Sequence, residues 1–581
     1  MTWFRAHGIR IDHTDSSIII PIKHGNGSVV LYGNEAEDMD EAFEDEAGAV
    51  FAVNITGGGN EQGNVDKEEE HVDVFMTSVA DKSHCAVEDP PDDDASKLLR
   101  YYKEELLGNA SVTGNDDESM PAEITDLLDH YQHCFVETSG LGRVHGYEHH
   151  IPLHDFTPVR SKPYRLTWEE EEHLRKELAT MTDLGLIRPS KGTWTSPIFF
   201  VRKKSGELRL VIDYPQLNSK TMKDAYPLPH LDDLLGSMAG AQIFSTLDAA
   251  SGYWQIPLAQ EAIELSGFVT KYGTYEFTVM PFGLTSAPAC FQRTMTSILG
   301  PFIGKFVFVF IDDIIIFSSS LQEHIKHLEQ ILQVCNQAGL RLKRAKCEFA
   351  RTYVEYLGHI VSREGLLPSP NNVVKIRKML PPRNIDQVRS FVGMVNYYRR
   401  HIPDCAAIMH PISKLLKNKN KKPFFWGPDQ ETAFVHIKII LTGPPILSYP
   451  DRMQVPILTT DASGEAVGAI LSQSPDGSDE DETVVAYESR VLRGPELAYA
   501  AVHQEALAIV WAVHKFRHFL AGRHFILRTD NSALTYILSN TKPSPKLQRW
   551  AAALLEYNFT IQHHPGKRNP ADALSRLPLE H

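Results

Sequence analysis

The 581-residue sequence predicts a multidomain protein with an acidic N-terminal segment, an α+β region and a final α/β block. The chain is too long to fold around one core. Short apolar runs alternate with amphipathic helical patterns over 121–360 and again over 451–576, while 361–450 is mostly helical in pattern. Residues 1–120 hold 27 acidic and 8 basic residues, a net charge of −19, whereas residues 121–581 carry +3.

The acidic charge of the N-terminal segment predicts a linker over residues 21–120 that is largely disordered. Its stretches NEAEDMDEAFEDEAGA, KEEE and EDPPDDDAS carry little apolar periodicity. An acidic arm that mimics nucleic acid or recruits a partner is the alternative, and we favour it less. The chain has no apolar run near the roughly 20 residues that a membrane helix needs, no secretory signal pattern at its start, and no CxxC pair. We therefore expect an intracellular, cytoplasmic protein that does not enter a membrane.

The first clear helix signal is a capping box, Thr167 with Glu170, ahead of apolar residues at helical spacing. Those apolar residues are Leu174, Leu178, Met181 and Leu184. The stretch SPIFFVRKKSGELRLVIDY then predicts two strands around a basic turn.

The stretch FVFVFIDDIIIFSS places two carboxylates, Asp312 and Asp313, between apolar runs. Neighbouring side chains in a regular strand point to opposite faces, so the pair cannot serve one site from within a strand. We predict a tight hairpin whose two buried strands present both carboxylates at the tip. Taken alone, a solvated Asp pair in a turn is the commoner interpretation.

A second carboxylate changes that balance. Asp248 ends an apolar strand in FSTLDAASGYWQIPL, about 60 residues upstream. Aspartates from two adjacent strands can hold two Mg²⁺ ions ~3.5–4 Å apart, the arrangement that serves in-line phosphoryl transfer. Magnesium suits such sparse carboxylate ligation, which water and phosphate oxygens complete.

Five ordered motifs resemble the reverse transcriptase of Pol polyproteins from gypsy-class LTR retrotransposons. They are LDAASGYWQIPL, VMPFGLTSAPACFQRTM, FIDDIIIFS, GLRLKRAKCEF and EYLGHIVSREG. The resemblance runs from about residue 150 to the C-terminus. It implies a right-hand polymerase of fingers, palm and thumb, followed by a ribonuclease H domain. It also implies an RNA template, a DNA primer, dNTPs, a priming tRNA and, as a further expectation, a homodimer.

The resemblance assigns roles position by position. Asp248 and Asp312 would be the principal metal ligands, and Asp313 would complete the set. The residues that would contact the nucleotide are Lys203, Lys204, Arg209, Tyr253, Phe282 and Lys346. Among these, Tyr253 would be the steric gate at the sugar 2′ position, Phe282 would pack under the nucleotide, and Lys346 would protonate pyrophosphate. The primer grip would be Leu357, Gly358 and His359.

Without the resemblance, simpler interpretations of several of these residues would stand. Tyr253 and Phe282 would be core aromatics, Lys346 would be an exposed lysine at a helix end, and the basic turn would be solvated.

Three departures separate the chain from the family pattern. Pro215 replaces a usual arginine, which removes a cation and a backbone donor near the template. Leu265, Ser266, Gly267 and Phe268 stand where the family usually has Lys-Thr-Ala-Phe. Phe310 replaces the tyrosine that commonly opens the Asp-pair turn, which removes one hydroxyl.

A second set of carboxylates occupies the final block and resembles ribonuclease H. Its members are Asp461, Glu505, Asp530 and Asp572. Four such acids would hold two Mg²⁺ or Mn²⁺ ions and cut the RNA of an RNA–DNA hybrid, which the domain would recognise by shape and 2′-hydroxyls. Taken singly, Asp572 could be a helix cap and Glu505 a helix-surface residue. His563 and His564 lie near a histidine position of some ribonucleases H, a weak signal.

The resemblance divides the chain further. Residues 1–20 resemble the C-terminal end of the family protease, and no Asp-Thr-Gly or Asp-Ser-Gly triplet occurs, so protease activity is not expected. No integrase zinc motif follows residue 576. We expect fingers and palm over 121–360, thumb and connection over 361–450, and ribonuclease H over 451–576. The competing hypothesis is a decayed or domesticated retroelement protein that binds nucleic acid or partners without catalysis, and Pro215 and Leu265 favour it.

Overall fold

The computed structural model describes most of the chain after residue 119. It describes residues 120–202, 206–229, 238–416, 424–443, 446–479, 481–529 and 545–563, residues 98 and 102, and the backbone of four short strands before residue 56. By contacts the chain divides into two units, Met1–Lys82 and Ser83–His581. In the described part, no helix is both long and apolar enough to cross a membrane.

The first unit contributes one small antiparallel sheet in the order β1-β2-β3-β4. Its strands are β1 (Arg10–Asp12), β2 (Ser17–Pro21), β3 (Ser28–Tyr32) and β4 (Asn54–Ile55). Most of the segment predicted to be a disordered linker lies outside the described residues.

In the second unit, a five-stranded sheet in the order β5-β10-β9-β6-β7 comes first. Its strands are β5 (Ile187–Pro189), β6 (Ser196–Arg202), β7 (Leu208–Ile212), β9 (Phe268–Thr270) and β10 (Gly273–Phe277). The helices beside them in sequence are α5 (Trp168–Asp183), α6 (Pro215–Lys220) and α8 (Gln260–Ile263). The predicted capping box starts α5, because Thr167 accepts from the Glu170 backbone N–H. Leu184 falls just past the helix and is exposed, which differs from the expected apolar face.

A four-stranded sheet in the order β11-β12-β8-β13 follows and carries the first carboxylate set. Its strands are β8 (Ile243–Asp248), β11 (Val307–Phe310), β12 (Asp313–Ser318) and β13 (Glu348–Arg351). The helices of this region are α3 (Ala122–His130), α4 (Val136–Ser139), α9 (Ala287–Leu299) and α10 (Leu321–Ala338).

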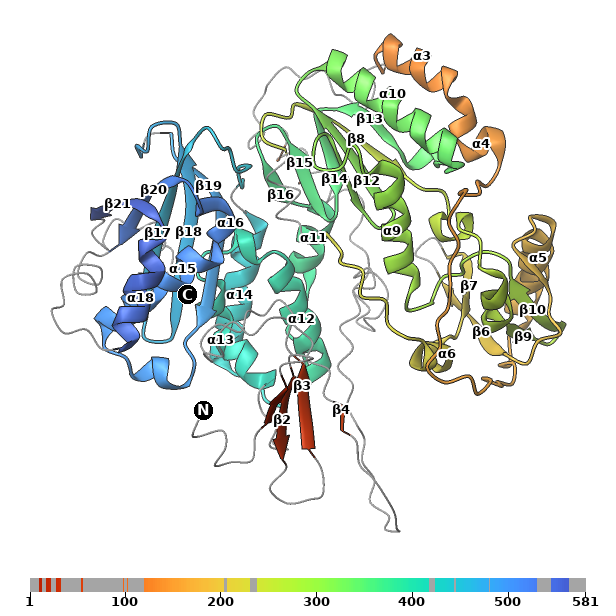
Figure 1. The fold of residues 1–581 in the computed structure, drawn as a ribbon, viewed down its shortest axis with the longest axis horizontal. Helices are drawn as coiled ribbons and strands as arrows, with labels where there is room; N and C mark the ends of the chain where they lie inside the picture. The colour runs from red at the N-terminus through yellow and green to blue at the C-terminus, as the bar shows by residue number, and fades with distance from the viewer. Residues whose placement is uncertain are drawn as a thin grey trace. The chain divides into compact units, whose positions relative to one another are not determined.

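Both faces of this sheet are covered. Successive side chains of β12 point to opposite faces and are buried in two different cores. Ile314 and Ile316 join the large core with α9 and α10, whereas Ile315 and Phe317 join a second core with the sheet that follows. Figure 1 shows α9 and α10 beside β8 and β12. Burial on both faces explains the continuous apolar runs on either side of the Asp pair.

Downstream lie a three-stranded sheet and a set of helices. The sheet has the order β14-β15-β16, with β14 (Tyr353–Tyr356), β15 (His359–Ser362) and β16 (Leu366–Pro368). The helices are α11 (Pro370–Lys378), α12 (Ile385–Tyr397), α13 (Cys405–Leu416) and α14 (Pro428–Thr442). They pack around Phe391, Phe434 and Ile437.

The final block is a five-stranded sheet in the order β19-β18-β17-β20-β21. Its strands are β17 (Val455–Ala462), β18 (Ala466–Ser474), β19 (Thr483–Val491), β20 (His524–Thr529) and β21 (Asn558–His563). Its helices are α15 (Ala501–Lys515), α16 (Arg517–Leu520) and α18 (Pro545–Leu555). The first three strands pair antiparallel, and β17-β20 and β20-β21 pair parallel. The buried face of α15 packs on this sheet.

Candidate active sites

The Asp pair lies at the tip of a tight hairpin, as the sequence predicts. Phe310 pairs with Asp313, so that only Ile311 and Asp312 form the turn between β11 and β12. Asp313 also pairs directly with Asp248 on β8. Directly opposed residues on antiparallel strands share one face, and the turn adds Asp312 to the same end. Three carboxylates from two segments therefore meet at one end of the sheet.

The three carboxylates repel one another and lack full compensation. Burial raises the pKa of Asp312 to about 7, and the charges of Asp313 and Asp248 add to the shift. The pKa of Asp313 is also raised, by loss of solvent and by Asp248. Lys346 Nζ lies 3.0 Å from Asp248 Oδ2 and is the cation that opposes these shifts. One lysine against three carboxylates leaves excess negative charge at the site.

A divalent cation fits this site. Asp312 Oδ1 is buried and has no hydrogen-bond partner among the described residues. A buried carboxylate oxygen without a partner costs free energy that a cation would offset. Within the described ranges, no three or more His, Cys, Asp or Glu side chains are arranged so that they could hold a metal ion. Any ion here would therefore complete its shell with water and phosphate oxygens, as Mg²⁺ commonly does.

Aromatic side chains connect the carboxylates with Arg209. The Tyr253 ring, on the 3₁₀ helix Gly252–Gln255, stacks on Phe282 with centroids 5.1 Å apart. The Arg209 guanidinium lies 5.2 Å from the centroid of the Phe282 ring. Burial raises the pKa of Tyr253, and the charge of Asp312 contributes, which places that phenol close to the carboxylates. The fold thus brings together three of the predicted nucleotide contacts; Lys203 and Lys204 lie outside the described residues.

Two residues outside the predicted site, Gln292 and Gly252, shape the tip of the hairpin. Ile311 has φ +52°, a left-handed conformation that a β-branched residue rarely adopts. The buried Gln292 side chain on α9 accepts from the Ile311 N–H at 2.7 Å and donates to the Val309 carbonyl at 3.2 Å. A Cβ on Gly252 would lie 2.7 Å from Phe291 Cζ and 3.2 Å from Asp312 Oδ1. The motif letters FQRTM and SGYW contained both residues, but only packing shows what they touch.

The predicted primer grip forms the turn between β14 and β15. Tyr356 pairs with His359, which leaves Leu357 and Gly358 as a two-residue turn. The Tyr356 hydroxyl donates to the Asp313 carbonyl at 3.2 Å, so this turn lies close to the hairpin that carries Asp312 and Asp313. Burial lowers the pKa of His359 to about 4, which keeps its ring neutral near neutral pH.

The three departures from the family pattern fit this fold. Pro215 occupies the first turn of α6, where its missing N–H removes no helix hydrogen bond. Ser266 uses its hydroxyl fully: it donates to the Ile263 carbonyl at 2.6 Å and accepts from the Phe277 N–H at 2.8 Å. A Cβ on Gly267 would lie 2.1 Å from the Trp194 carbonyl oxygen, so glycine suits this backbone. Phe310 keeps its strand pairing with Asp313.

Only part of the second carboxylate set is described. Asp461 lies near the end of β17 and Glu505 on α15. The parallel register, with Thr459 opposite Arg528, brings the end of β20 beside Asp461. Asp530, the next residue after β20, lies outside the described residues, as do His564 and Asp572. His563 is the last residue of β21 and pairs with Thr529.

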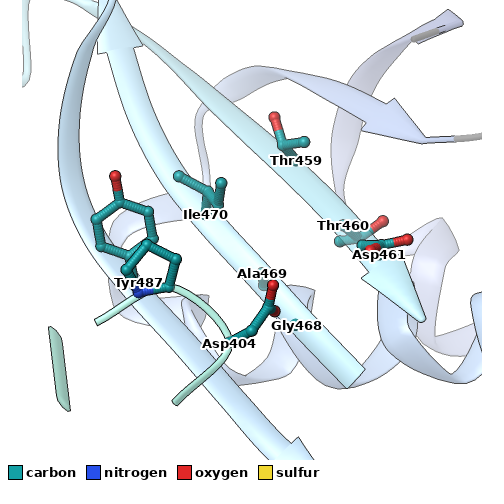
Figure 2. A pocket seen from close by; sticks show the side chains of 9 residues that line it. Asp404, Thr459, Thr460, Asp461, Gly468, Ala469, Ile470 and Tyr487 are labelled. Atoms are coloured by element: carbon teal, nitrogen blue, oxygen red, sulfur yellow. The ribbon is translucent and has the colours of Figure 1, made fainter. Parts of the chain in front are cut away.

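A small pocket adjoins Asp461, and Asp404, Gly468 and Tyr487 also line it. Figure 2 shows Asp404, from the segment before α13, reaching toward β18 beside Asp461. A Cβ on Gly468 would lie 2.4 Å from Asp404 Oδ1, so this contact requires glycine. Arg399 donates to Glu488 on β19 at 2.5 Å, which is a second contact between the helical region and this sheet.

Comparison with protein families decides the class. The family described as reverse transcriptase (RNA-dependent DNA polymerase) matches residues 201–361, and the RNase H-like domain found in reverse transcriptase matches residues 451–557. The chain is 40% identical over 430 residues to a retrovirus-related Pol polyprotein from transposon 297 of Drosophila melanogaster. The chain therefore holds a reverse transcriptase domain and an RNase H-like domain, and it is similar to retrovirus-related Pol polyproteins.

Further relatives agree with this assignment. Identity is 38% over 443 residues to the Pol polyprotein from the gypsy transposon of Drosophila melanogaster, and 36% over 425 residues to the transposon Tf2-3 polyprotein of Schizosaccharomyces pombe. These three alignments cover 73%, 73% and 72% of this chain but only 40%, 42% and 31% of the relatives. The chain thus spans well under half of the curated relatives it matches.

Solved structures show the same fold. The foamy viral protease-reverse transcriptase in complex with dsDNA aligns with a TM-score of 0.67 at 19% identity, over 82% of this chain and 97% of that one. A second structure of that protein, with dsDNA and marked dRH, aligns with a TM-score of 0.69 at 17% identity, over 94% of this chain and 92% of that one. The predicted fold class, a right-hand polymerase followed by a ribonuclease H-like domain, is confirmed.

Proposed function

We propose that this chain is an RNA-directed DNA polymerase with ribonuclease H activity, which copies retrotransposon RNA into DNA and degrades the RNA of the hybrid. The observation that carries the proposal is the palm carboxylate set: Asp248 opposite Asp313, with Asp312 at the hairpin tip and one oxygen unpartnered. Divalent cations that bind together with a nucleotide triphosphate would neutralise this excess negative charge.

Each palm residue takes a role that its position supports. Asp248 and Asp312 would be the principal ligands of two divalent ions, Mg²⁺ with Mn²⁺ as the alternative, and Asp313 would complete the set. Bound there, the ions would supply Lewis-acid stabilisation of the phosphoryl transfer. The primer 3′-hydroxyl attacks the α-phosphate of the dNTP, and pyrophosphate leaves. Lys346, whose Nζ lies 3.0 Å from Asp248 Oδ2, would donate a proton to that leaving group.

The rest of the nucleotide site consists of Tyr253, Phe282 and Arg209. Phe282 would pack under the incoming nucleotide, and Tyr253 would meet its 2′ position and exclude ribonucleotides. Arg209, together with Lys203 and Lys204, would neutralise the triphosphate. The primer terminus would rest on the backbone of Leu357, Gly358 and His359.

The ribonuclease H part would use Asp461, Glu505, Asp530 and Asp572 around two further ions to cut the RNA strand. Partners would be an RNA template, a DNA primer and the RNA–DNA hybrid. The foamy viral protease-reverse transcriptase is known in complex with dsDNA and in complex with RNA/DNA hybrid. A priming tRNA and a homodimer remain part of the proposal. We also propose the domain boundaries: the end of a protease over 1–20, an acidic linker over 21–120, fingers and palm over 121–360, thumb and connection over 361–450, and ribonuclease H over 451–576.

The decayed-element hypothesis loses the support that it drew from residue identities. Pro215 begins a helix without loss of a hydrogen bond, and Leu265 packs against the main core.

The test is dNTP incorporation on poly(rA)–oligo(dT) with Mg²⁺ or Mn²⁺, compared with Asp312→Asn. We expect incorporation by the natural chain and loss of at least a hundredfold in the variant, equivalent to ~2.7 kcal/mol of transition-state stabilisation. Cleavage of an RNA–DNA hybrid, compared with Asp461→Asn, tests the second activity separately. A folded chain that binds the hybrid without incorporation would instead support the decayed-element hypothesis.

A further inference from the structure

The turn between β14 and β15 adopts a conformation that its sequence does not favour. Leu357 has φ +46° and Gly358 has φ +68°, so both residues are left-handed, as a two-residue hairpin turn of type I′ requires. Glycine adopts this conformation freely, but a left-handed leucine costs about 1–2 kcal/mol. Such a turn persists only where its surroundings hold it.

Two adjacent tyrosines at the end of α12 supply that hold. The Tyr397 hydroxyl donates to the Leu357 carbonyl, and the Tyr398 hydroxyl donates to the Gly358 carbonyl at 2.9 Å. The Ser369 N–H also donates to the Gly358 carbonyl at 2.9 Å. Both carbonyl groups of the turn are therefore bound by side chains about 40 residues downstream.

The tyrosine rings are themselves fixed. Asn372 Nδ2 on α11 donates to the Tyr398 hydroxyl at 2.8 Å, which orients the hydroxyl hydrogen toward Gly358. The His359 ring centroid lies 5.4 Å from that of Tyr397 and 5.2 Å from that of Tyr398. A Cβ on Gly358 would approach Asn372 Nδ2 to 3.1 Å and the Tyr398 hydroxyl to 3.3 Å. The contact leaves little room for the turn to shift.

On its other side, the same turn is joined to the hairpin that carries Asp312 and Asp313. Tyr356, the residue before the turn, is buried and donates its hydroxyl to the Asp313 carbonyl at 3.2 Å. A continuous path of hydrogen bonds and covalent bonds thus runs from α12 through the turn to the palm carboxylates.

We propose that Tyr397 and Tyr398 are positioning residues that set where the Leu357–Gly358 turn holds the primer 3′ end relative to the palm carboxylates. The proposal rests on the proposed polymerase function, because the primer contact belongs to that function. Neither tyrosine touches the reacting atoms; each acts through a backbone carbonyl of the turn.

The chain offers a matched control for the loss of such a hydroxyl. Tyr449 is buried and donates its hydroxyl to the Gly365 carbonyl at 3.3 Å, in the turn between β15 and β16. Tyr449→Phe therefore removes the same kind of hydrogen bond from the same three-stranded sheet, at its other turn.

The experiment compares Tyr397→Phe, Tyr398→Phe and Tyr449→Phe in single-turnover incorporation on a primer–template, with the full chain and Mg²⁺. We expect each of the first two variants to lower the maximal incorporation rate about 2- to 10-fold, the usual effect of one hydrogen bond, and the double variant to lower it further. The dNTP concentration at half-maximal rate should stay within twofold of that of the natural chain, since Tyr253, Phe282 and Arg209 are unchanged. Tyr449→Phe should match the natural chain.

The readouts separate positioning from simple destabilisation and from failure of the proposed function. Partial unfolding lowers the amplitude of the reaction, not the rate per active molecule. Unchanged maximal rates in both tyrosine variants, or an equal loss in Tyr449→Phe, would overturn the inference while incorporation by the natural chain upholds the polymerase. If Tyr398→Phe does not fold, Asn372→Ala tests the same hydroxyl from outside and should reproduce the rate loss; an unchanged rate there also overturns it.

Discussion

At the residue scale, Asp312 determines the character of the palm site. Its pKa of about 7 comes first from burial and then from Asp313 and Asp248, with Lys346 opposing. A carboxyl group whose folded-state pKa is raised keeps its proton in the folded protein while the unfolded chain has lost it. Its contribution to stability therefore falls as pH rises from about 4 to 7 and stays low above that.

We accordingly expect Asp312→Asn to stabilise the metal-free protein above pH 7. The gain should be on the order of 1–3 kcal/mol, because each unit of pKa shift corresponds to about 1.4 kcal/mol and water at the site screens part of it. Thermal unfolding at pH 8 and pH 5 measures it, and the gain should be smaller at pH 5. Equal gains in stability at both pH values would show that the gain does not come from removal of the Asp312 charge.

Tyr253 makes a separate prediction about sugar selection. Tyr253→Val removes the ring that would meet the 2′ position, so we expect the preference for dNTPs over rNTPs to fall about tenfold or more, equivalent to ~1.4 kcal/mol of lost discrimination. Competition between labelled dNTP and rNTP measures it. The control is Phe268→Leu. Phe268 is a core aromatic whose ring centroid lies 5.7 Å from that of Tyr275, and its substitution should leave the ratio of dNTP to rNTP incorporation unchanged.

At the element scale, the hairpin and helix α9 form one structure. Ile311 keeps its left-handed conformation because Gln292 binds the backbone at Val309 and at Ile311, where β11 enters the turn. A helix residue thus fixes the direction in which the strand tip presents Asp312.

Gln292→Leu should therefore lower polymerase activity and leave hybrid cleavage unchanged. The Ile311 N–H would lose its acceptor, at a cost of about 1–3 kcal/mol. Primer extension and hybrid cleavage by the same preparation measure the two effects. Thr294→Val on the same helix, whose hydroxyl donates to the Cys290 carbonyl, is the matched control and should affect neither. Equal loss of both activities would point to general unfolding instead.

At the scale of the whole molecule, contacts join the helical region to the final sheet. Arg399 donates to Glu488, which is 8% exposed, and the Ala406 N–H donates to Ser489 Oγ at 2.9 Å. Removing one partner of a buried ion pair leaves an uncompensated charge.

Glu488→Gln should consequently lower the free energy of unfolding by about 3 kcal/mol. Denaturant unfolding measures it. Asp386→Asn removes the partner of Arg389 in a pair whose side chains are 61% and 86% exposed, so it should change stability by less than ~0.5 kcal/mol. A result for Glu488→Gln as small as that of the control would show that the contact with β19 contributes little.

The uneven charge of the chain makes one more prediction. Residues 1–120 carry a net charge of −19, which repels phosphates, whereas residues 121–581 carry +3. Removal of residues 1–119 should strengthen hybrid binding severalfold at about 0.05 M salt, with little change at about 0.5 M, where charges are screened. Titration of a labelled hybrid at both salt concentrations tests this, and an unchanged affinity at low salt would contradict it.

The sequence by itself determined the fold class, the hairpin at Asp312 and Asp313, and the capping box at Thr167. These follow from local periodicity, turn geometry and ordered motifs, which need no tertiary contact. Only the tertiary structure decided that Gln292, Gly252, Tyr397 and Tyr398 serve the site, and that Ser266 and Gly267 are compatible with the fold. Most of their partners lie from about 10 to about 70 residues away along the chain, and their letters look like ordinary core or surface residues. Their function arises from packing distance and from hydrogen bonds to backbone groups, and a one-dimensional pattern carries neither.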